Sequence, residues 1–260
     1  MRISIYQIDA FTDRLFHGNP AAVCPLESWL PDEMMQQIAA ENNLAETAFF
    51  VPTGNGYRLR WFTPKVEVDL CGHATLASAY VIARILKPGT RNIRFDSRSG
   101  PLLVEIAGER IQLDFPADPP RPIVPPAGLE PALGLKPQEV LTSRIKYLLV
   151  LATANEVRQV TPNMEALMKL DQSGVIITAP GANCDFVSRF FAPRMDVPED
   201  PVTGSAHCVL TPYWTEKLGK KKLHARQLSA RGGELFCEAH GERVWITGQA
   251  VKYLEGVIEI

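Results

Sequence analysis

The feature that most constrains this chain is a repeat at half its length. Segments 60–68 (RWFTPKVEV) and 189–197 (RFFAPRMDV) share four of nine residues, and their offset, 189 − 60 = 129, is about half of the 260 residues. After a slip of three residues the likeness resumes, with 71–74 (CGHA) against 203–206 (TGSA). This order predicts a duplicated domain, in which each copy runs from a strand through a proline turn and a small-residue loop into a helix.

The middle of the chain is rich in proline. Eight of the 21 prolines fall between residues 116 and 137, and such a run favours extended backbone and resists pairing within a central strand. We therefore predict an N-terminal domain over 1–117 and a C-terminal domain over 118–250. The last strand, 251–260, is free in this prediction to return to the first domain.

Each half contains one helix with an unusually apolar surface. Residues 74–86 are apolar nearly all round, which predicts a helix buried on every side. A second helix is expected over 205–218, where Pro212 predicts a kink or a late start. Alternating apolar residues predict the strands around these helices, at 2–8, 47–51, 57–62, 91–97, 102–107 and 110–115, then 145–152, 173–179, 184–192, 226–230, 234–239 and 243–250.

Composition argues against several classes of protein. The net charge is −2, whereas a nucleic-acid binder normally has a basic face; the one lysine run, 220–222, reads as a solvated turn. Five cysteines without a CxxC pair suggest neither a disulfide framework nor a zinc knuckle. No stretch approaches 18 consecutive apolar residues, so we expect no membrane span and, by default, a cytoplasmic protein.

The two small-residue loops are candidate ligand sites. In each, a glycine (Gly72 or Gly204) leads directly into an apolar helix, and the backbone N–H groups at a helix start attract negative charge. Two such helix starts facing each other would clamp a ligand that carries a carboxylate or an enolate. The alternative is that both are ordinary turns.

Two reactive side chains flank the first glycine. His73 is a candidate general acid. Cys71 stands at a helix start, where the pKa of a thiol tends to be lowered, although most free cysteines are simply small buried apolar residues.

Acidic and hydroxyl side chains supply the remaining candidates. Asp200, Thr203 and Ser205 precede or begin the second helix, where they could act on a ligand or merely cap the helix. Glu46 lies beside the apolar strand 47–51. At the edge of a buried strand, desolvation would raise the pKa of its carboxyl group and suit it to proton transfer; a lone glutamate is otherwise usually a surface residue.

The whole pattern resembles the PhzF-like family, which is named for a phenazine-biosynthesis isomerase and is related to diaminopimelate epimerase. The resemblance covers nearly the whole chain. It rests on four segments: 9–12 (DAFT) with 18–23 (GNPAAV), 45–49 (AETAF), 62–64 (FTP) with 67–75 (EVDLCGHAT), and 199–206 (EDPVTGSA).

The resemblance implies an α+β fold of two pseudo-symmetric domains, each a curved, mostly antiparallel sheet around a central helix. It also implies a site in the interdomain cleft, commonly a homodimer, and neither a cofactor nor a metal. Glu46 would be the proton-shuttling acid/base, assisted by His73, Asp200 and Ser205. The residues expected to bind substrate are Asn19, Cys71, Gly72, Thr203 and Gly204.

One departure separates this chain from amino-acid epimerases of the same fold, which use two thiols. The first thiol position is Cys71, but the second aligns with Thr203, which offers no acid near neutral pH. The sequence thus favours an isomerase that moves a proton on a small carboxylate metabolite, with no nucleic-acid or membrane partner. The alternatives are a thiol-dependent racemase or epimerase that uses Cys71, and a non-catalytic protein that binds small acids.

Overall fold

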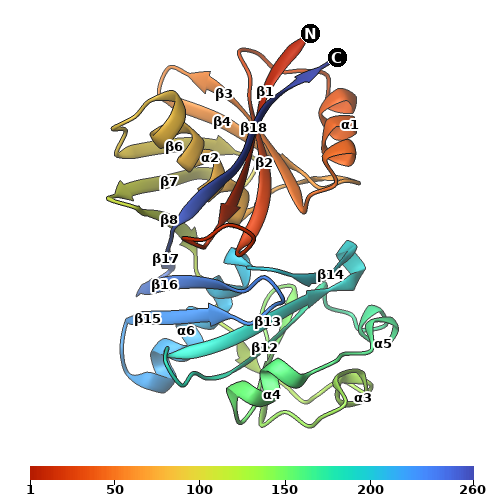
Figure 1. Cartoon of the computed structure of the whole chain (residues 1–260). Coiled ribbons are helices and arrows are strands. Elements are labelled where there is room, and N and C mark those ends of the chain that lie inside the picture. The colour runs from red at the N-terminus through yellow and green to blue at the C-terminus, as the bar shows by residue number, and fades with distance from the viewer. The chain divides into compact units, whose positions relative to one another are not determined.

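A computed structural model describes all 260 residues and divides them into two compact units (Figure 1). The first unit combines Met1–Asp114 with Ile246–Ile260, and the second is Phe115–Trp245.

The first unit holds a mixed sheet with one long surface helix and one buried helix. At its edge, the terminal strand pairs antiparallel with the first strand along its full length, so the two chain ends lie together (Figure 1). The elements are β1 (Arg2–Ala10), β2 (Asn19–Pro25), α1 (Asp32–Asn42), β3 (Glu46–Thr53), β4 (Gly56–Phe62), β5 (Glu67–Val68), α2 (Gly72–Tyr80) with a π-helical turn (Val81–Leu86), β6 (Asn92–Ser97), β7 (Gly100–Ala107), β8 (Arg110–Pro116) and β18 (Ala250–Glu259).

The second unit has the same kinds of element and three short helices in addition. Its elements are β9 (Arg121–Pro122), α3 (Leu129–Leu133), β10 (Glu139–Thr142), β11 (Lys146–Val150), α4 (Ala154–Gln159), α5 (Met164–Met168), β12 (Gly174–Pro180), β13 (Phe186–Ala192), a 3₁₀ turn (Pro193–Met195), β14 (Val197–Asp200), α6 (Gly204–Leu218), β15 (Lys222–Gln227), β16 (Gly233–His240) and β17 (Arg243–Gly248).

The two units follow one plan of strand pairing. In the first, β2 pairs parallel with β3, β3 antiparallel with β4, and β4 parallel with β6. In the second, β11, β12, β13 and β15 repeat these three pairings in the same order. In both, the buried helix connects the last two of these strands. The α+β fold of two pseudo-symmetric domains is therefore confirmed.

Burial of α2 and α6 explains their composition. Every residue of α2 from Gly72 to Ala79 is buried, as its apolar surface predicts. Helix α6 begins at Gly204 and continues through Pro212, so the expected late start is wrong. Pro212 lacks an N–H, which frees the carbonyl group of Cys208 four residues earlier, and the backbone N–H of Asp118 donates to that carbonyl at 3.0 Å.

An arginine–glutamate ion pair stabilises the segment of chain that leads into each buried helix. Arg60 makes two hydrogen bonds of 2.7 Å to Glu67, and Arg189 makes two of 2.7 and 2.9 Å to Glu199. The sequence alignment set Glu67 against Asp196, which is wrong in register. The 3₁₀ turn after β13 adds three residues before Glu199. The three-residue insertion in the second repeat therefore lies before this glutamate, and not after it as the sequence comparison placed it.

Most differences between predicted and observed elements lie in short segments. The strand expected at 226–230 lies at Lys222–Gln227, so Lys222 belongs to a strand and not to a turn. Gln227 explains the error, because this polar residue is buried and ends the apolar alternation of β15 early. The elements that were not predicted are the strands β2, β5, β9, β10 and β14 and the helices α3, α4 and α5.

A forced turn leads the chain from β1 into β2. Gly18 has a φ of +66°, and a Cβ atom there would lie 2.2 Å from the carbonyl oxygen of Ala10. Only glycine fits both conditions. The turn fixes where Asn19, the fully buried first residue of β2, enters the sheet.

We predict that Gly18→Ala destabilises the protein more than Gly89→Ala, a matched control. Gly89 also has a positive φ, of +91°, but nothing lies within 4 Å of its added Cβ. The control should cost about 1–2 kcal/mol for the left-handed backbone, and Gly18→Ala about 1–3 kcal/mol more for the clash. Urea unfolding of both variants measures the difference, and equal losses would contradict the proposed close approach.

Candidate functional site

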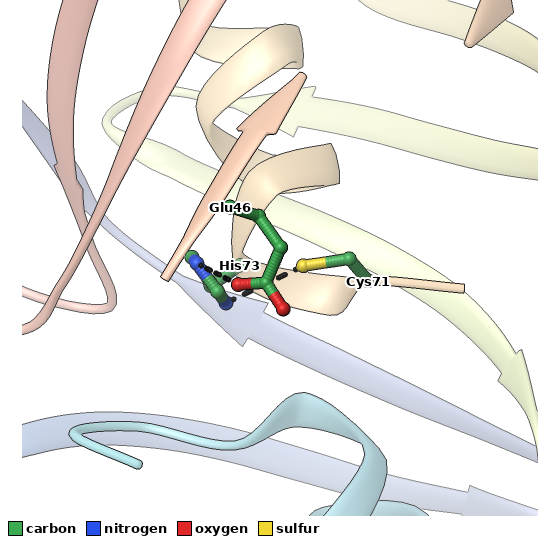
Figure 2. Close-up of side chains that lie close together, drawn as sticks. All are labelled: Glu46, Cys71 and His73. Carbon is green, nitrogen blue, oxygen red and sulfur yellow. Dashed lines mark hydrogen bonds and ion pairs between the residues drawn. The ribbon is translucent and has the colours of Figure 1, made fainter. Parts of the chain in front are cut away.

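Three polar side chains meet at the start of α2 (Figure 2). Glu46 is the first residue of β3, and its carboxylate oxygen Oε2 lies 3.2 Å from Nε2 of His73, the second residue of α2. Cys71 immediately precedes the helix, and its Sγ lies 3.5 Å from Nδ1 of the same imidazole. Parallel pairing of β2 with β3 brings Asn19 to this place, where its Nδ2 lies 3.2 Å from Nδ1.

Burial makes the His73 imidazole neutral. Its side chain is 5% exposed, and desolvation lowers its pKa from 6.5 to about 3. The amide Nδ2 of Asn19 is a donor, so Nδ1 accepts and the single ring proton lies on Nε2. That proton faces Glu46. The imidazole therefore presents a neutral N–H to the carboxylate at 3.2 Å, without regular hydrogen-bond geometry, and is not a cationic partner.

The start of α2 adds backbone groups to this cluster. The residue before the helix, Cys71, has an extended backbone and makes no side-chain capping bond. The first N–H groups of a helix have no partner within the helix and favour negative charge. Gly72 has no positive φ, so no unusual backbone conformation requires glycine there.

A second cluster surrounds the start of α6. The hydroxyl of Thr203 donates to the Asp200 carboxylate at 2.5 Å. Gln227 holds both residues: its Nε2 donates to the carbonyl of Asp200 at 2.7 Å and to the Thr203 hydroxyl oxygen at 3.1 Å, and its Oε1 accepts from the Thr203 N–H at 2.9 Å. The loop is thus fixed by a buried side chain from β15.

Thr203 and Cys71 occupy equivalent places. Each is the residue before its buried helix, and neither makes a side-chain capping bond. The capping interpretation of Thr203 is therefore wrong, since its hydroxyl is used on Asp200. Gly204 and Ser205 are the first two residues of α6, with Gly204 buried and Ser205 partly exposed.

The structure brings the candidates together in two groups. Glu46, Cys71, His73 and Asn19 form one group in the first unit, while Asp200, Thr203, Gly204 and Ser205 follow one another in the second. Sequence reasoning missed Gln227. Its signal was a glutamine at a position of β15 where the alternation calls for an apolar side chain.

The first group also has the composition of a metal site. The possible ligand atoms of Glu46, Cys71 and His73 all lie within 4.8 Å of one another. The set offers one oxygen, one sulfur and one nitrogen, which suits zinc better than magnesium or calcium.

None of the helices combines the length and the apolar character needed to cross a lipid bilayer.

Comparison with known proteins places the chain in a family. Residues 8–256 match the family model of phenazine biosynthesis-like proteins, PhzC-PhzF. The chain is 54% identical to a protein named an uncharacterized isomerase in Pseudomonas aeruginosa, over the full length of both. It is also 42% identical to the human phenazine biosynthesis-like domain-containing protein, with 99% of each chain covered.

Solved structures agree with this assignment. A PhzF family protein of Enterococcus faecalis has a TM-score of 0.97 at 47% identity, with 100% of both chains covered. A hydroxyproline epimerase of Agrobacterium vitis, at 9% identity and a TM-score of 0.63, covers 99% of this chain and 92% of its own and shares the fold alone. The family match and the full-length identity to proteins named isomerases show that this chain belongs to the PhzF-like family and is an isomerase.

Proposed function

We propose that this isomerase moves a proton on a small carboxylate metabolite without a cofactor, with Glu46 as the acid/base. The observation that carries the proposal is the contact of 3.2 Å between Glu46 Oε2 and the buried His73 Nε2. The neutral imidazole lies beside the carboxylate without adding a full positive charge, so the carboxylate remains available as a base.

The chemistry follows from this arrangement. Glu46 takes a proton from a carbon activated by the substrate's carboxylate or by an adjacent double bond, and the electron pair becomes an enolate or its extended form. The N–H groups at the start of α2 stabilise the developing negative charge. The protonated Glu46 then returns the proton to a second carbon of the same face. The Glu46 side chain is 16% exposed, which supports access by a small acid.

Asp200 and Ser205 assist the same reaction in this proposal, and Asn19, Cys71, Gly72, Thr203 and Gly204 bind the substrate. The support is local order: Gln227 fixes the Asp200–Thr203 loop by three hydrogen bonds. A homodimer and a cytoplasmic location stay predictions.

A thiol-dependent racemase is the second candidate. The contact of 3.5 Å between Cys71 Sγ and His73 Nδ1 favours it, because a nearby imidazole can take the thiol proton. Against it, the equivalent place before α6 holds Thr203, so the second thiol of a symmetric racemase is missing. A protein that only binds small acids is the third candidate, and it predicts binding without exchange of hydrogen.

The first prediction for activity concerns Glu46→Gln. Small unsaturated and α-amino carboxylic acids are incubated with the protein in deuterated water, and exchange at carbon is followed by proton NMR. Loss of the base should slow exchange about 100- to 10,000-fold. Glu41→Gln, which changes an exposed glutamate of α1, should leave the rate unchanged.

The same assay separates the racemase. Exchange that survives Glu46→Gln but disappears in Cys71→Ser would overturn the glutamate mechanism. Saturable binding of an acid without exchange of any substrate would favour the non-catalytic alternative.

The second prediction for activity concerns Asp200→Asn. Asparagine keeps an acceptor for the Thr203 hydroxyl but removes the charge, so the fold of the loop should persist. We expect exchange to slow about tenfold, the usual difference of about 1.4 kcal/mol between charge-assisted and neutral hydrogen bonds. Asp196→Asn changes an exposed acid of the preceding turn and should have no effect; equal rates for all three proteins would remove Asp200 from the site.

The neutral state of His73 predicts a pH dependence of stability. Its pKa is about 3 in the folded protein and 6.5 when exposed, so between these values the unfolded chain binds more protons and acidification favours unfolding. From pH 7 to pH 5 this one residue should lower the free energy of unfolding by about 2 kcal/mol. In His73→Gln that part of the loss should vanish, as measured by urea unfolding at both pH values. An unchanged dependence would mean that His73 binds protons equally in the folded and unfolded states, which would contradict its lowered pKa.

A further inference from the structure

We propose that Glu46, Cys71 and His73 form a binding site for a thiophilic divalent cation such as Zn²⁺, and that the bound ion switches the enzyme off. The proposed inhibition rests on the proposed function of Glu46, because an ion on its carboxylate occupies the lone pairs that would take the substrate proton. The proposed metal binding depends on the donor atoms alone.

The spacing of two donors already matches a zinc site. Zinc binds sulfur at about 2.3 Å and imidazole nitrogen at about 2.0 Å with tetrahedral angles, which separates the two donor atoms by about 3.5 Å. Cys71 Sγ and His73 Nδ1 lie 3.5 Å apart. The third donor, a carboxylate oxygen of Glu46, lies within 4.8 Å of the others, and rotation about the glutamate side-chain bonds can shorten that distance.

The buried imidazole is already held in place before an ion binds. The His73 ring is fixed by its position in α2 and by the contact of Asn19 with Nδ1. Coordination through Nδ1 would replace the Asn19 contact and leave the ring proton on Nε2, while the Glu46 carboxylate would turn from that proton toward the ion. A site whose central ligand is already held needs little reorganisation to bind.

The step balances with water as the only other participant. The thiol of Cys71 loses its proton to solvent, the resulting thiolate binds the ion, and the imidazole and carboxylate bind through existing lone pairs. No oxidant or reductant takes part. Sulfur and nitrogen donors select zinc and cobalt over magnesium, which prefers oxygen ligands and keeps several of its waters.

The binding test uses the full-length protein freed of metal by dialysis against a chelator. ZnCl₂ should raise its melting temperature by mass action, whereas MgCl₂ should not. CoCl₂ should produce a thiolate-to-cobalt charge-transfer band, which reports a Co–S bond without any activity assay. Cys71→Ser should abolish the band and weaken Zn²⁺ binding by about 100-fold or more, since even changes outside the ligand shell cost about 10- to 100-fold.

Cys184→Ser is the matched control. Cys184 is also a free cysteine, but it is partly exposed whereas Cys71 is buried, and it lies in the second unit just before β13. This variant should keep the band, the affinity and the exchange activity of the wild type. A band that persists in Cys71→Ser, or disappears in Cys184→Ser, would overturn the site, as would a melting temperature that Zn²⁺ does not change.

Inhibition is tested separately on the exchange reaction, each variant being compared with its own rate without metal. Zn²⁺ should stop exchange by the wild type over the same concentrations that produce binding, and a chelator should restore it. Binding at Cys71 without inhibition would leave the metal site standing and overturn the role of Glu46. Inhibition of equal strength in Cys71→Ser would show that the ion acts elsewhere and overturn the proposed switch.

Discussion

Burial of the first turn of α2 is the constraint on which the candidate site depends. A helix start normally finds partners in water or in a capping side chain, but here it lies in the interior and its preceding residue, Cys71, makes no capping bond. Negative charge that interacts with the N–H groups of that turn must therefore come from side chains or from a ligand. The same burial removes the charge from His73 by lowering its pKa to about 3, which leaves a neutral ring beside a carboxylate.

In the duplicated fold, two related loops lead into buried helices, and their side chains differ. In both units a bidentate arginine–glutamate pair precedes the buried helix, and the arginine also lies over the face of a phenylalanine two residues on, Phe62 or Phe191. The two ion pairs are alike, but the residues at the helix starts that follow them differ. The first loop offers a thiol and an imidazole, and the second offers a hydroxyl tied to Asp200. Divergence after duplication thus changed the chemistry while the support was kept.

Sequence alone predicted the duplication, the buried helices and the grouping of Glu46 with His73, because each has a local sequence signal or a family motif. It failed where a partner comes from far along the chain. Gln227 lies 24 residues beyond Thr203, and nothing in its own neighbourhood indicates three hydrogen bonds to a loop. The free carbonyl of Cys208 could be expected from Pro212, but not that the N–H of Asp118 would satisfy it. Short elements such as α3 were missed because the proline-rich composition around them outweighed a five-residue helical signal.

Asn19 links a backbone constraint at Gly18 to the side chains of His73 and Glu46. Gly18 must adopt a left-handed backbone because the carbonyl of Ala10 fills the space of a side chain, and this turn sets Asn19 at the start of β2. The amide of Asn19 then donates to Nδ1 of His73, which requires the imidazole proton to be on Nε2, toward Glu46. The tautomer of the imidazole therefore depends on the turn that positions Asn19. In the proposed mechanism, a substitution in that turn is expected to alter proton transfer without removing Glu46 or His73.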